Sequence, residues 1–359
     1  MKVVAMEEWI PFEVDPGQAD RTFWDVYHAF RRRREQELRP GDTPALTDEQ
    51  AETLLKEQDP THLRRGWVLI SEGARVISEF SIMVTKPKAP EHESSRHLLL
   101  ADGAVLREYR RRGIGTMWAQ KALELMEEHG REVLSTRTEE ADGHAFLSWL
   151  GAECKLVMTE NRLDFRQVDW GLVERWVEVG RRRLPRVSLD LYEDRIPDEM
   201  MEEYCPILNE LANRMPFDEL DHGRLVLTPK VLKEQYRIFQ GIGGLHHSLI
   251  ARSEDERIIG LTDVLYRSAR PTYIYQNFAG VLPEWRGSGL GKWLLAAMFQ
   301  YHRRKYPETR WIVTDNAASN AAVLAIMRPL GFKEYQTYGL YQISRQKLAR
   351  KLGAVGQVR

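Results

Sequence analysis

The chain of 359 residues is longer than one ordinary domain, and a composition of 43% hydrophobic and 29% charged residues is typical of a folded globular protein. A formal net charge of −1 excludes a global basic field that would draw the protein onto nucleic acid or an anionic membrane. No stretch approaches the roughly 18 apolar residues of a membrane span, and the N-terminus does not follow a signal-peptide pattern. The two cysteines, Cys154 and Cys205, are far apart, which favours a reducing cytoplasm over a disulfide framework.

The first half of the chain predicts two helices, a pair of strands, a helix, a strand, a second helix and closing strands. A capping signal, Thr47-Asp-Glu-Gln, opens the second helix. These elements are predicted at Asp20–Arg34, Thr47–Gln58, Trp67–Val84, a helix carrying Trp118, Ala122 and Leu125, Arg131–Thr136, a helix ending in Phe146–Gly151, and Leu156–Val168.

The second half predicts a linking helix that Pro185 ends and then the same order of elements again. The basic tail Lys347–Arg359 is predicted to be frayed. The elements are expected at Trp170–Arg183, Val187–Tyr192, Pro197–Ala212, Pro229–Phe239, His247–Leu265, a helix carrying Leu294, Ala297, Met298 and Tyr301, Arg310–Asp315, a helix ending in Ile326–Gly331, and Lys333–Ser344.

An internal repeat explains this symmetry. Val105–Thr116 aligns without gaps on Val281–Lys292, 176 residues later, with six of twelve positions identical. Because the flanking strands and helices repeat as well, the chain is interpreted as a duplicated α/β domain. The predicted domains are residues 1–168 and 187–359, joined by the linking helix at 169–186.

Each repeat carries Arg-x-x-Gly-x-Gly between a predicted strand and a predicted helix, at Arg110 and at Arg286. Glycines there let the backbone turn tightly and approach a ligand, and free N–H groups at a helix start suit a pyrophosphate. Two common phosphate motifs are excluded. Gly291-Lys292 is followed by Trp293, which does not match Walker A, and Gly287-Ser-Gly289-Leu-Gly291 lacks dinucleotide-fingerprint spacing.

The second repeat resembles the GNAT superfamily of acyl-CoA N-acyltransferases over Ala279–Phe332. The resemblance is carried by a strand ending in Val281, the loop from Arg286 to Gly291, Asn316 and Asn320, and the closing Leu330-Gly-Phe332. The first repeat matches in Val105 and Arg110–Gly115, but Glu140 stands in place of the Asn and Ala152 in place of the Phe. The resemblance implies two tandem GNAT-like domains, each with a mixed, mostly antiparallel central sheet flanked by helices.

The resemblance also implies acetyl-CoA as co-substrate, with its pyrophosphate on the glycine loop and its pantetheine held by backbone groups near the valine. The implied coenzyme-binding residues in the second repeat are Val281, Leu282, Arg286, Gly287, Ser288, Gly289, Leu290, Gly291, Lys292, Asn316 and Asn320. Those in the first repeat are Val105, Arg110, Arg111, Arg112, Gly113, Ile114, Gly115 and Thr116.

The catalytic positions depart from the family pattern. Where many members have a glutamate six residues before the valine, this chain has Tyr275, and Leu99 in the first repeat. The position of the family's usual acid tyrosine holds Met327, with Leu147 as its counterpart. Tyr275 is therefore a candidate proton relay. Tyr335, Tyr338 and Tyr341 on the last strands are candidates to replace the missing acid, although tyrosines are common in strands for packing alone.

The resulting hypothesis is an acetyl-CoA-dependent N-acetyltransferase of the cytoplasm, acting on a small-molecule primary amine, with catalysis in the second repeat. The acidic stretch Asp218–Asp221 is a possible approach for a cationic amine. The histidines lack metal-ligand spacing, so no metal is expected, and no nucleic-acid or membrane partner is expected either. The alternatives are a non-catalytic acyl-CoA-binding or interaction protein and a protein with two active sites. The sequence carries no signal for the oligomeric state.

Overall fold

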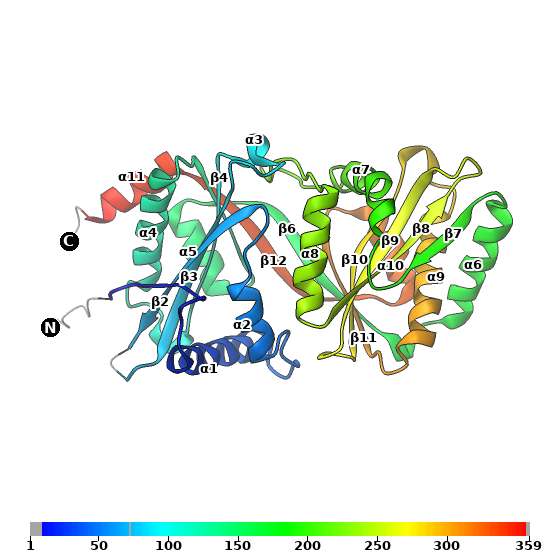
Figure 1. The fold of residues 1–359 in the computed structure, drawn as a ribbon. Helices are drawn as coiled ribbons and strands as arrows, with labels where there is room; N and C mark the ends of the chain where they lie inside the picture. The colour runs from blue at the N-terminus through cyan, green and yellow to red at the C-terminus, as the bar shows by residue number, and fades with distance from the viewer. Residues whose placement is uncertain (1–8, 72, 357–359) are drawn as a thin grey trace. The chain divides into compact units, whose positions relative to one another are not determined.

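A computed structural model describes residues 9–71 and 73–356 of the chain, which form two compact units (Figure 1). Unit 1 holds the chain up to Leu156, together with Glu219–Gly223 and everything from Tyr338 onward. Unit 2 holds Val157–Asp218 and Arg224–Thr337. The expected α/β class is confirmed.

Helix starts follow local capping chemistry. The Asp20 side chain accepts a hydrogen bond from the Phe23 amide at the start of α1, and Thr47 and Gln50 form the predicted capping box at α2. The helices lie at α1 (Arg21–Leu38), α2 (Asp48–Lys56), α3 (His92–Ser95), α4 (Ile114–Glu128), α5 (Ala141–Leu150), α6 (Trp170–Arg183), α7 (Met201–Ala212), α8 (Pro229–Gly241), α9 (Leu290–Lys305), α10 (Ala321–Leu330) and α11 (Arg345–Gly356).

The strands lie at β1 (Phe12–Val14), β2 (His62–Ile70), β3 (Val76–Thr85), β4 (Leu98–Val105), β5 (Val133–Thr138), β6 (Glu153–Asp164), β7 (Ser188–Tyr192), β8 (Gly244–Arg252), β9 (Ile258–Arg267), β10 (Tyr273–Val281), β11 (Trp311–Ala317) and β12 (Lys333–Ser344). The strands and helices follow the same order in both halves, except that α3, between β3 and β4, has no counterpart between β9 and β10.

The sheet of unit 1 has the strand order β1-β2-β3-β4-β5-β12, antiparallel throughout except for the parallel pair β4 and β5. Helix α1 packs on one face through Phe30, which contacts Val68 and Val76. Helices α4 and α5 cover the other face, where Trp118 stacks on Phe80 with ring centroids 5.2 Å apart.

The sheet of unit 2 repeats this plan in the order β7-β8-β9-β10-β11-β6, with β10 and β11 as its parallel pair. Helices α7 and α8 bury Tyr204 and Leu232 on one face, against Leu261. Helices α6, α9 and α10 lie on the other. The predicted linking helix is thus α6 in unit 2, where Gly180 lets its backbone approach the Trp293 side chain closely.

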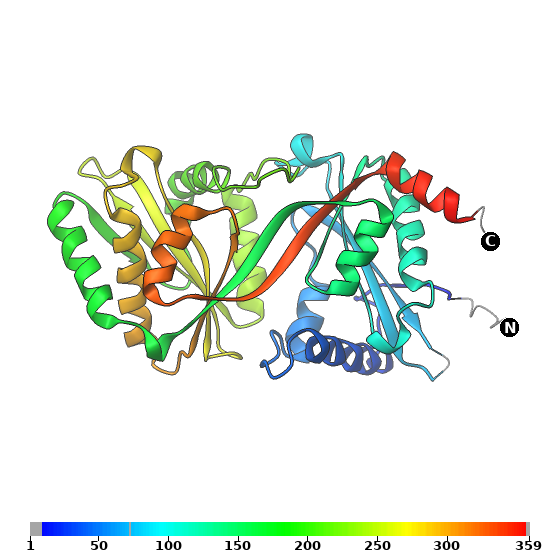
Figure 2. The same cartoon turned by 180° about the vertical axis from the view of Figure 1, so that it is seen from behind.

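The last strands of the two repeats are exchanged between the units. Gly339–Ser344 of β12 pairs with β5 and completes the sheet of unit 1, while Met158–Asp164 of β6 pairs with β11 and completes that of unit 2. Figure 2 shows β12, in orange-red, running to the strands of unit 1 and on to α11. The repeat in the sequence predicts a domain boundary at residue 168. The compact units instead follow the strand pairing, so the chain passes from unit 1 to unit 2 after Leu156 and, apart from Glu219–Gly223, returns to unit 1 at Tyr338.

The prediction of a frayed tail from Lys347 is wrong as far as Gly356. Residues Arg345–Gly356 form α11, and its Leu348 and Leu352 are buried in the core of unit 1 beside α4. These leucines are about one helical turn apart, so both point to the same side of the helix and are buried together. The basic residues between them make the segment look polar in the sequence.

Candidate active sites

In each unit the two parallel strands separate soon after they begin. Strands β4 and β5 pair only from Leu98–Leu100, and β10 and β11 only from Tyr273–Tyr275. Beyond these points both strands continue, so their facing N–H and C=O groups are not joined to each other. Unpaired backbone groups along a strand edge can hold an extended, amide-bearing chain in the manner of an added strand. The pantetheine arm of coenzyme A has that chemistry.

The glycine loops lie directly after these separated strands. Gly113 and Gly289 are the N-caps of α4 and α9 and adopt φ values of +86° and +96°, which favour glycine because a Cβ would clash with the backbone. The first N–H groups of each helix therefore face outward at the positive end of the helix dipole. In unit 2 one of them, the Leu290 amide, donates to the Ser288 hydroxyl at 3.2 Å.

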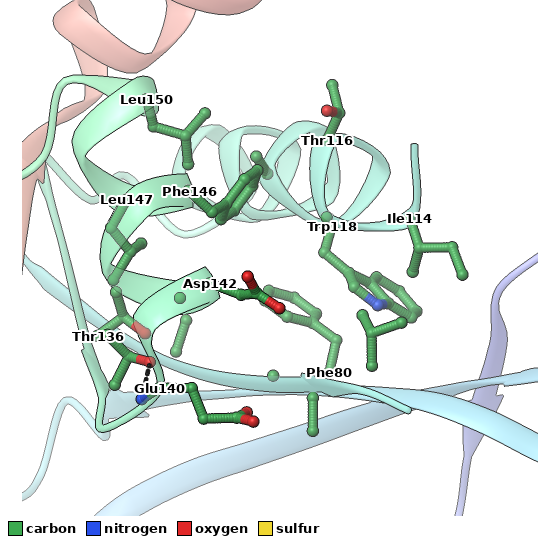
Figure 3. A pocket seen from close by; sticks show the side chains of 18 of the residues that line it. Phe80, Ile114, Thr116, Trp118, Thr136, Glu140, Asp142, Phe146, Leu147 and Leu150 are labelled. Carbon is green, nitrogen blue, oxygen red and sulfur yellow. Dashed lines mark hydrogen bonds between the residues drawn. The ribbon is translucent and has the colours of Figure 1, made fainter. Parts of the chain in front are cut away.

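Unit 1 contains a cleft of about 510 Å³ at its strand separation (Figure 3). Apolar side chains of β3, α4 and α5 form its inner wall, and Figure 3 shows Phe146 and Leu147 of α5 facing Trp118 of α4 across it. Seven of the predicted residues line it: Val105, Arg110, Arg111, Gly113, Ile114, Gly115 and Thr116. The structure thus brings these seven together around one cleft.

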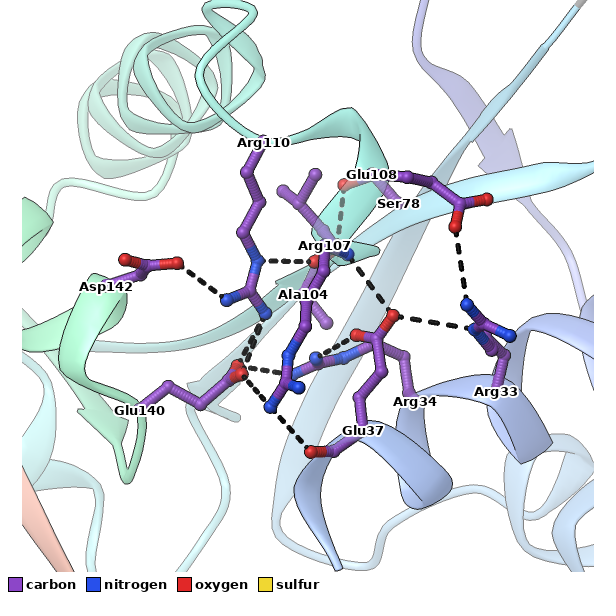
Figure 4. Close-up of polar contacts among 11 residues, drawn as sticks. Arg33, Arg34, Glu37, Ser78, Ala104, Arg107, Glu108, Arg110, Glu140 and Asp142 are labelled. Carbon is purple, nitrogen blue, oxygen red and sulfur yellow. Dashed lines mark hydrogen bonds and ion pairs between the residues drawn. The ribbon is translucent and has the colours of Figure 1, made fainter. Parts of the chain in front are cut away.

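The arginine of the unit 1 loop is bound by acids of the same unit (Figure 4). The Arg110 guanidinium donates to both carboxylate oxygens of Glu140 at 2.8 Å and to Asp142 at 3.0 Å, and its Nε donates to the Val105 carbonyl at 3.1 Å. Arg34 of α1 donates to the same Glu140 carboxylate at 2.9 Å. Burial works to raise the pKa of Glu140, but hydrogen bonds from Arg110 and Arg34 outweigh burial and hold that pKa below its usual value.

The corresponding arginine of unit 2 has a different environment. Arg286 forms no ion pair with any residue that the structure describes. The residue at the helix start that matches Glu140 is Asn320, which caps α10 by accepting from the Val323 amide at 3.3 Å. Lys292 lies 5.2 Å from the Trp176 ring, and Asn316 donates to the sulfur of Met327. The loop of unit 2 therefore keeps its arginine charge available to an anion.

Tyr275 stands at the last paired position before β10 and β11 separate. Its hydroxyl donates to the Asp315 carboxylate at 2.6 Å. A bulge at Asn277 shifts the register of β10 by one residue, and β4 has no such shift. The expected equivalence of Tyr275 and Leu99 is therefore wrong by one position: Leu100 occupies the matching place, while Leu99 lies in the apolar core.

Polar groups are buried on the same face of unit 2, under α7 and α8. Asp263 accepts from the Asn277 amide at 2.8 Å and from the Tyr204 hydroxyl at 3.3 Å, and lies 3.4 Å from His246 Nε2. The Tyr236 hydroxyl contacts the other ring nitrogen of His246 at 3.0 Å. Burial raises the pKa of both tyrosines, so their hydroxyls stay neutral. Because side chains alternate along strands, Tyr275, Asp315 and Asp263 all face this side of the sheet.

Tyr338 lies in unit 1, because it belongs to the exchanged part of β12, and the Arg137 guanidinium stands 5.9 Å from its ring. Tyr275 and Tyr338 are therefore in different units. Tyr341 is also in unit 1, where its hydroxyl lies 2.8 Å from His144 Nδ1, whereas Tyr335 is in unit 2. The carboxylates of Asp218–Asp221 are similarly divided: Asp218 accepts from Ser319 in unit 2, and Asp221 pairs with His97 in unit 1.

Sequence reasoning missed a carboxyl group in unit 1. Glu79 on β3 accepts from the Tyr27 hydroxyl of α1 at 3.0 Å. Burial, with the nearby Asp102 as a smaller cause, raises the pKa of Glu79 to about 7. Asp102 and Ala104, the cross-strand partner of Glu79, line the cleft. Glu79 is the only charged residue of β3, and this was the signal that could have revealed it.

Two further properties concern metals and membranes. Within residues 9–71 and 73–356, no group of three or more His, Cys, Asp or Glu side chains is placed to hold a metal ion. In the same part of the chain, no helix is long and apolar enough to cross a membrane.

Comparison with known proteins agrees with this architecture. The chain resembles in fold a tandem GNAT protein from the clavulanic acid biosynthesis pathway, at 21% identity and a TM-score of 0.72, covering 94% of this chain and 99% of that one. It also resembles a GCN5-related N-acetyltransferase from Sphaerobacter thermophilus, at 15% identity and a TM-score of 0.64, covering 94% and 96%. No curated protein matches it in sequence.

A family profile for the Acetyltransferase (GNAT) family matches residues 24–151 and again residues 206–332, which together make up more than half of the chain. Each match contains one pair of separated strands and one glycine loop, so the family assignment and the site geometry refer to the same residues. The chain therefore belongs to the GNAT acetyltransferase family, with two copies of the family's domain in tandem.

Proposed function

We propose that this protein transfers an acetyl group from acetyl-CoA to the primary amine of a small molecule, and that transfer takes place in unit 2. The observation that carries the proposal is the Tyr275–Asp315 pair at the separation of β10 and β11, beside a glycine loop whose Arg286 has no competing carboxylate among the described residues. The thioester supplies an activated acyl group, and the chain supplies binding, orientation and a route for the proton.

The residues of unit 2 fit a coenzyme A thioester. The outward N–H groups at the start of α9 and the side chains of Arg286 and Lys292 suit a diphosphate, because backbone donors, helix dipole and cationic groups all favour negative charge. The unpaired edges of β10 and β11 suit the amides of pantetheine. Donors at these edges can also stabilise charge that develops on the thioester oxygen.

The polar face under α7 and α8 suits the acceptor. An alkyl amine with a pKa near 10.4 is about 99.96% protonated at pH 7, so it must lose a proton before it attacks. Asp315 places a partly exposed carboxylate on this face, which favours binding of an ammonium group. Asp315, already hydrogen-bonded by Tyr275, can receive the amine proton through the tyrosine hydroxyl.

A second candidate places the transfer in unit 1. The specific observation is the cleft of about 510 Å³ with Glu79 nearby, a carboxyl group whose raised pKa of about 7 suits a general base. A non-catalytic acyl-CoA-binding protein is the third candidate, since the position of the family's usual acid holds buried Met327 in unit 2 and buried Leu147 in unit 1.

Matched substitutions in the two glycine loops distinguish these candidates. Gly115 and Gly291 are better targets than Gly113 and Gly289, whose positive φ would strain any other residue. A Cβ at Gly291 would lie 3.6 Å from Ile326, and one at Gly115 3.1 Å from the Phe146 ring, so both sites admit a side chain after small shifts. Gly291→Glu and Gly115→Glu place a carboxylate where the diphosphate would bind. An acidic side chain in the first helical turn interacts favourably with the helix dipole, so the helix itself should not be destabilised by the charge.

The experiment measures acetyl-CoA binding by calorimetry and CoA release with a panel of amines. Gly115→Ala and Gly291→Ala serve as controls, and thermal unfolding confirms folding. Loss of CoA release in Gly291→Glu alone supports transfer in unit 2. Loss of CoA release in Gly115→Glu alone indicates that transfer takes place in unit 1. Loss in both variants indicates that each unit is needed. Binding without release for every amine supports the non-catalytic alternative.

A further inference from the structure

Units 1 and 2 differ in the contacts of the loop arginine, the side chain that would meet a diphosphate. Glu140 engages Arg110 through both of its carboxylate oxygens and also binds Arg34, and Asp142 takes a further donor of the same guanidinium. Figure 4 shows Arg110 of the loop lying between these two acids of the α5 start. Arg34, Arg110, Glu140 and Asp142 all line the cleft.

This arrangement leaves few hydrogen-bond donors of Arg110 available to a second anion. One guanidinium nitrogen of Arg110 donates to both oxygens of Glu140 in a charge-assisted contact, and the Arg110 side chain is only 16% exposed. Its Nε is also engaged, by the Val105 carbonyl. A diphosphate approaching the loop would have to displace Glu140 and would then lie beside two carboxylates, so repulsion opposes the attraction of the helix start.

Unit 2 shows what the same fold looks like without this acid. Asn320 holds the helix-start position of Glu140, is uncharged and caps its helix, and Arg286 is not bound by a carboxylate in the described chain. The strand separations and the glycine N-caps are alike in the two units. The loop of unit 1 also carries Arg111 and Arg112 where unit 2 has Gly287 and Ser288. Residue 140 is therefore one of the positions at which the two units differ in charge rather than in backbone shape.

We propose that Glu140 determines the ligand specificity of unit 1 by holding Arg110 away from diphosphate, so that this cleft recognises the pantetheine part of its ligand with little contribution from the diphosphate. The inference rests on the proposed use of coenzyme A thioesters by this chain. It predicts that unit 1 distinguishes poorly between coenzyme A and pantetheine, which share the thiol-bearing arm and differ in the phosphate-bearing nucleotide.

The test replaces Glu140 with the residue of the other copy. Glu140→Asn is combined with Gly291→Glu, so that the unit 1 site is measured alone. Asn is a favourable helix N-cap, whereas Glu140 makes no side-chain cap. Arg34 keeps Glu37 at 2.9 Å as a partner and Arg110 keeps Asp142, so folding is expected to persist. Glu140→Gln, which retains the length of the side chain, is the second variant.

Affinities for coenzyme A and for pantetheine are measured separately by calorimetry or by competition with acetyl-CoA. We expect Glu140→Asn to tighten coenzyme A binding about tenfold, the equivalent of one recovered charge-assisted contact, and to leave pantetheine binding unchanged. Glu108→Gln is the matched control, because Glu108 is an exposed loop acid that pairs with Arg33 and not with Arg110, and it should change neither affinity.

Equal effects on both ligands, or no effect on either, would overturn the inference. Failure of the proposed function would look different. In that case wild-type protein would show no coenzyme A site that Gly291→Glu removes, and no amine would give CoA release, whatever residue stands at position 140.

Discussion

The two copies have the same fold but keep their charged and polar groups in different places. In unit 1 the loop arginine Arg110 is bound by Glu140, whereas in unit 2 Arg286 faces no carboxylate of the described chain. Each copy also buries a tyrosine from its first helix against an acid, but Tyr27 reaches Glu79 on β3, and Tyr204 reaches Asp263 on β9 at a different register position.

The comparison teaches that backbone features and side-chain chemistry can vary separately. Strand separation and glycine-started helices are properties of the backbone, and both copies retain them. The acids and tyrosines around them differ between the copies, and we base our proposals on ligand binding and proton transfer on these differences. Substitutions that exchange residues between matching positions therefore test each difference directly.

The largest expected effect concerns the exchanged strand. A chain ending at residue 168 lacks β12 and α11, and with them Tyr341, Ile343, Leu348 and Leu352 of the unit 1 core. Losing four buried apolar side chains costs on the order of 8 kcal/mol, which is comparable with the whole stability of a domain. We expect no cooperative thermal unfolding transition for this chain, as followed by circular dichroism.

Fusion of residues 333–356 to that truncated chain through a flexible linker is the control, and it should restore the transition. Cooperative unfolding of residues 1–168 alone would show that the first copy folds without the exchanged strand.

The next effect concerns acid stability. His302 of α9 is fully buried without a hydrogen-bond partner in the described structure, and burial lowers its pKa to about 3. Because the folded-state pKa lies below the unfolded value, the stabilisation is present above pH 6.5 and lost as pH falls towards 3. The matching residue of unit 1 is Met126. We expect His302→Met to change the free energy of unfolding of unit 2 more favourably at pH 4 than at pH 7, by about 3 kcal/mol.

Hydrogen exchange of α9 peptides at both pH values measures this difference. The reverse substitution Met126→His should make α4 in unit 1 acid-labile. The same response at pH 4 and pH 7 in both variants would show that these positions do not set acid stability.

A smaller effect with the opposite sign is expected at Glu79. Its raised pKa of about 7 means that its contribution is present below pH 4.5 and lost as pH rises through 7. Leu261 stands at the matching position in unit 2. We expect Glu79→Gln, which keeps an acceptor for Tyr27, to stabilise unit 1 by about 2 kcal/mol at pH 8 and very little at pH 5.

Denaturant unfolding at the two pH values measures the difference, and Glu108→Gln is the control for a surface charge. An effect that is independent of pH would contradict a titrating buried carboxyl.

The smallest effect concerns proton transfer in unit 2. Tyr275→Phe removes the hydroxyl that donates to Asp315 but keeps the ring. We expect kcat to fall about tenfold with little change in KM, because in the proposed mechanism the hydroxyl acts on the reacting proton and not on coenzyme binding. Steady-state CoA release measures both constants. Tyr335→Phe, at a tyrosine of β12 that lies in the same unit, should change neither; equal losses in the two variants would argue against a specific role.

Sequence patterns predicted the repeat, the element order and the surroundings of both glycine loops, because each depends on neighbouring residues. They missed features that depend on distant pairing. The bulge at Asn277 moves Leu100 into the place expected for Leu99, and the exchange of β12 puts Tyr338 in unit 1. Periodicity within one strand contains no information about its partner strand, so neither feature was available from the sequence.

By itself, then, the sequence determined a duplicated α/β chain with a glycine loop between a strand and a helix in each copy. The reason is local: glycines at positive φ and apolar periodicity act within a few residues. Tertiary structure decided that β12 completes the sheet of unit 1, that Arg110 donates hydrogen bonds to Glu140, and that the Tyr27 hydroxyl donates to Glu79. These outcomes join residues 30 to about 200 positions apart, where packing and charge pairing, and not local propensity, select the partner.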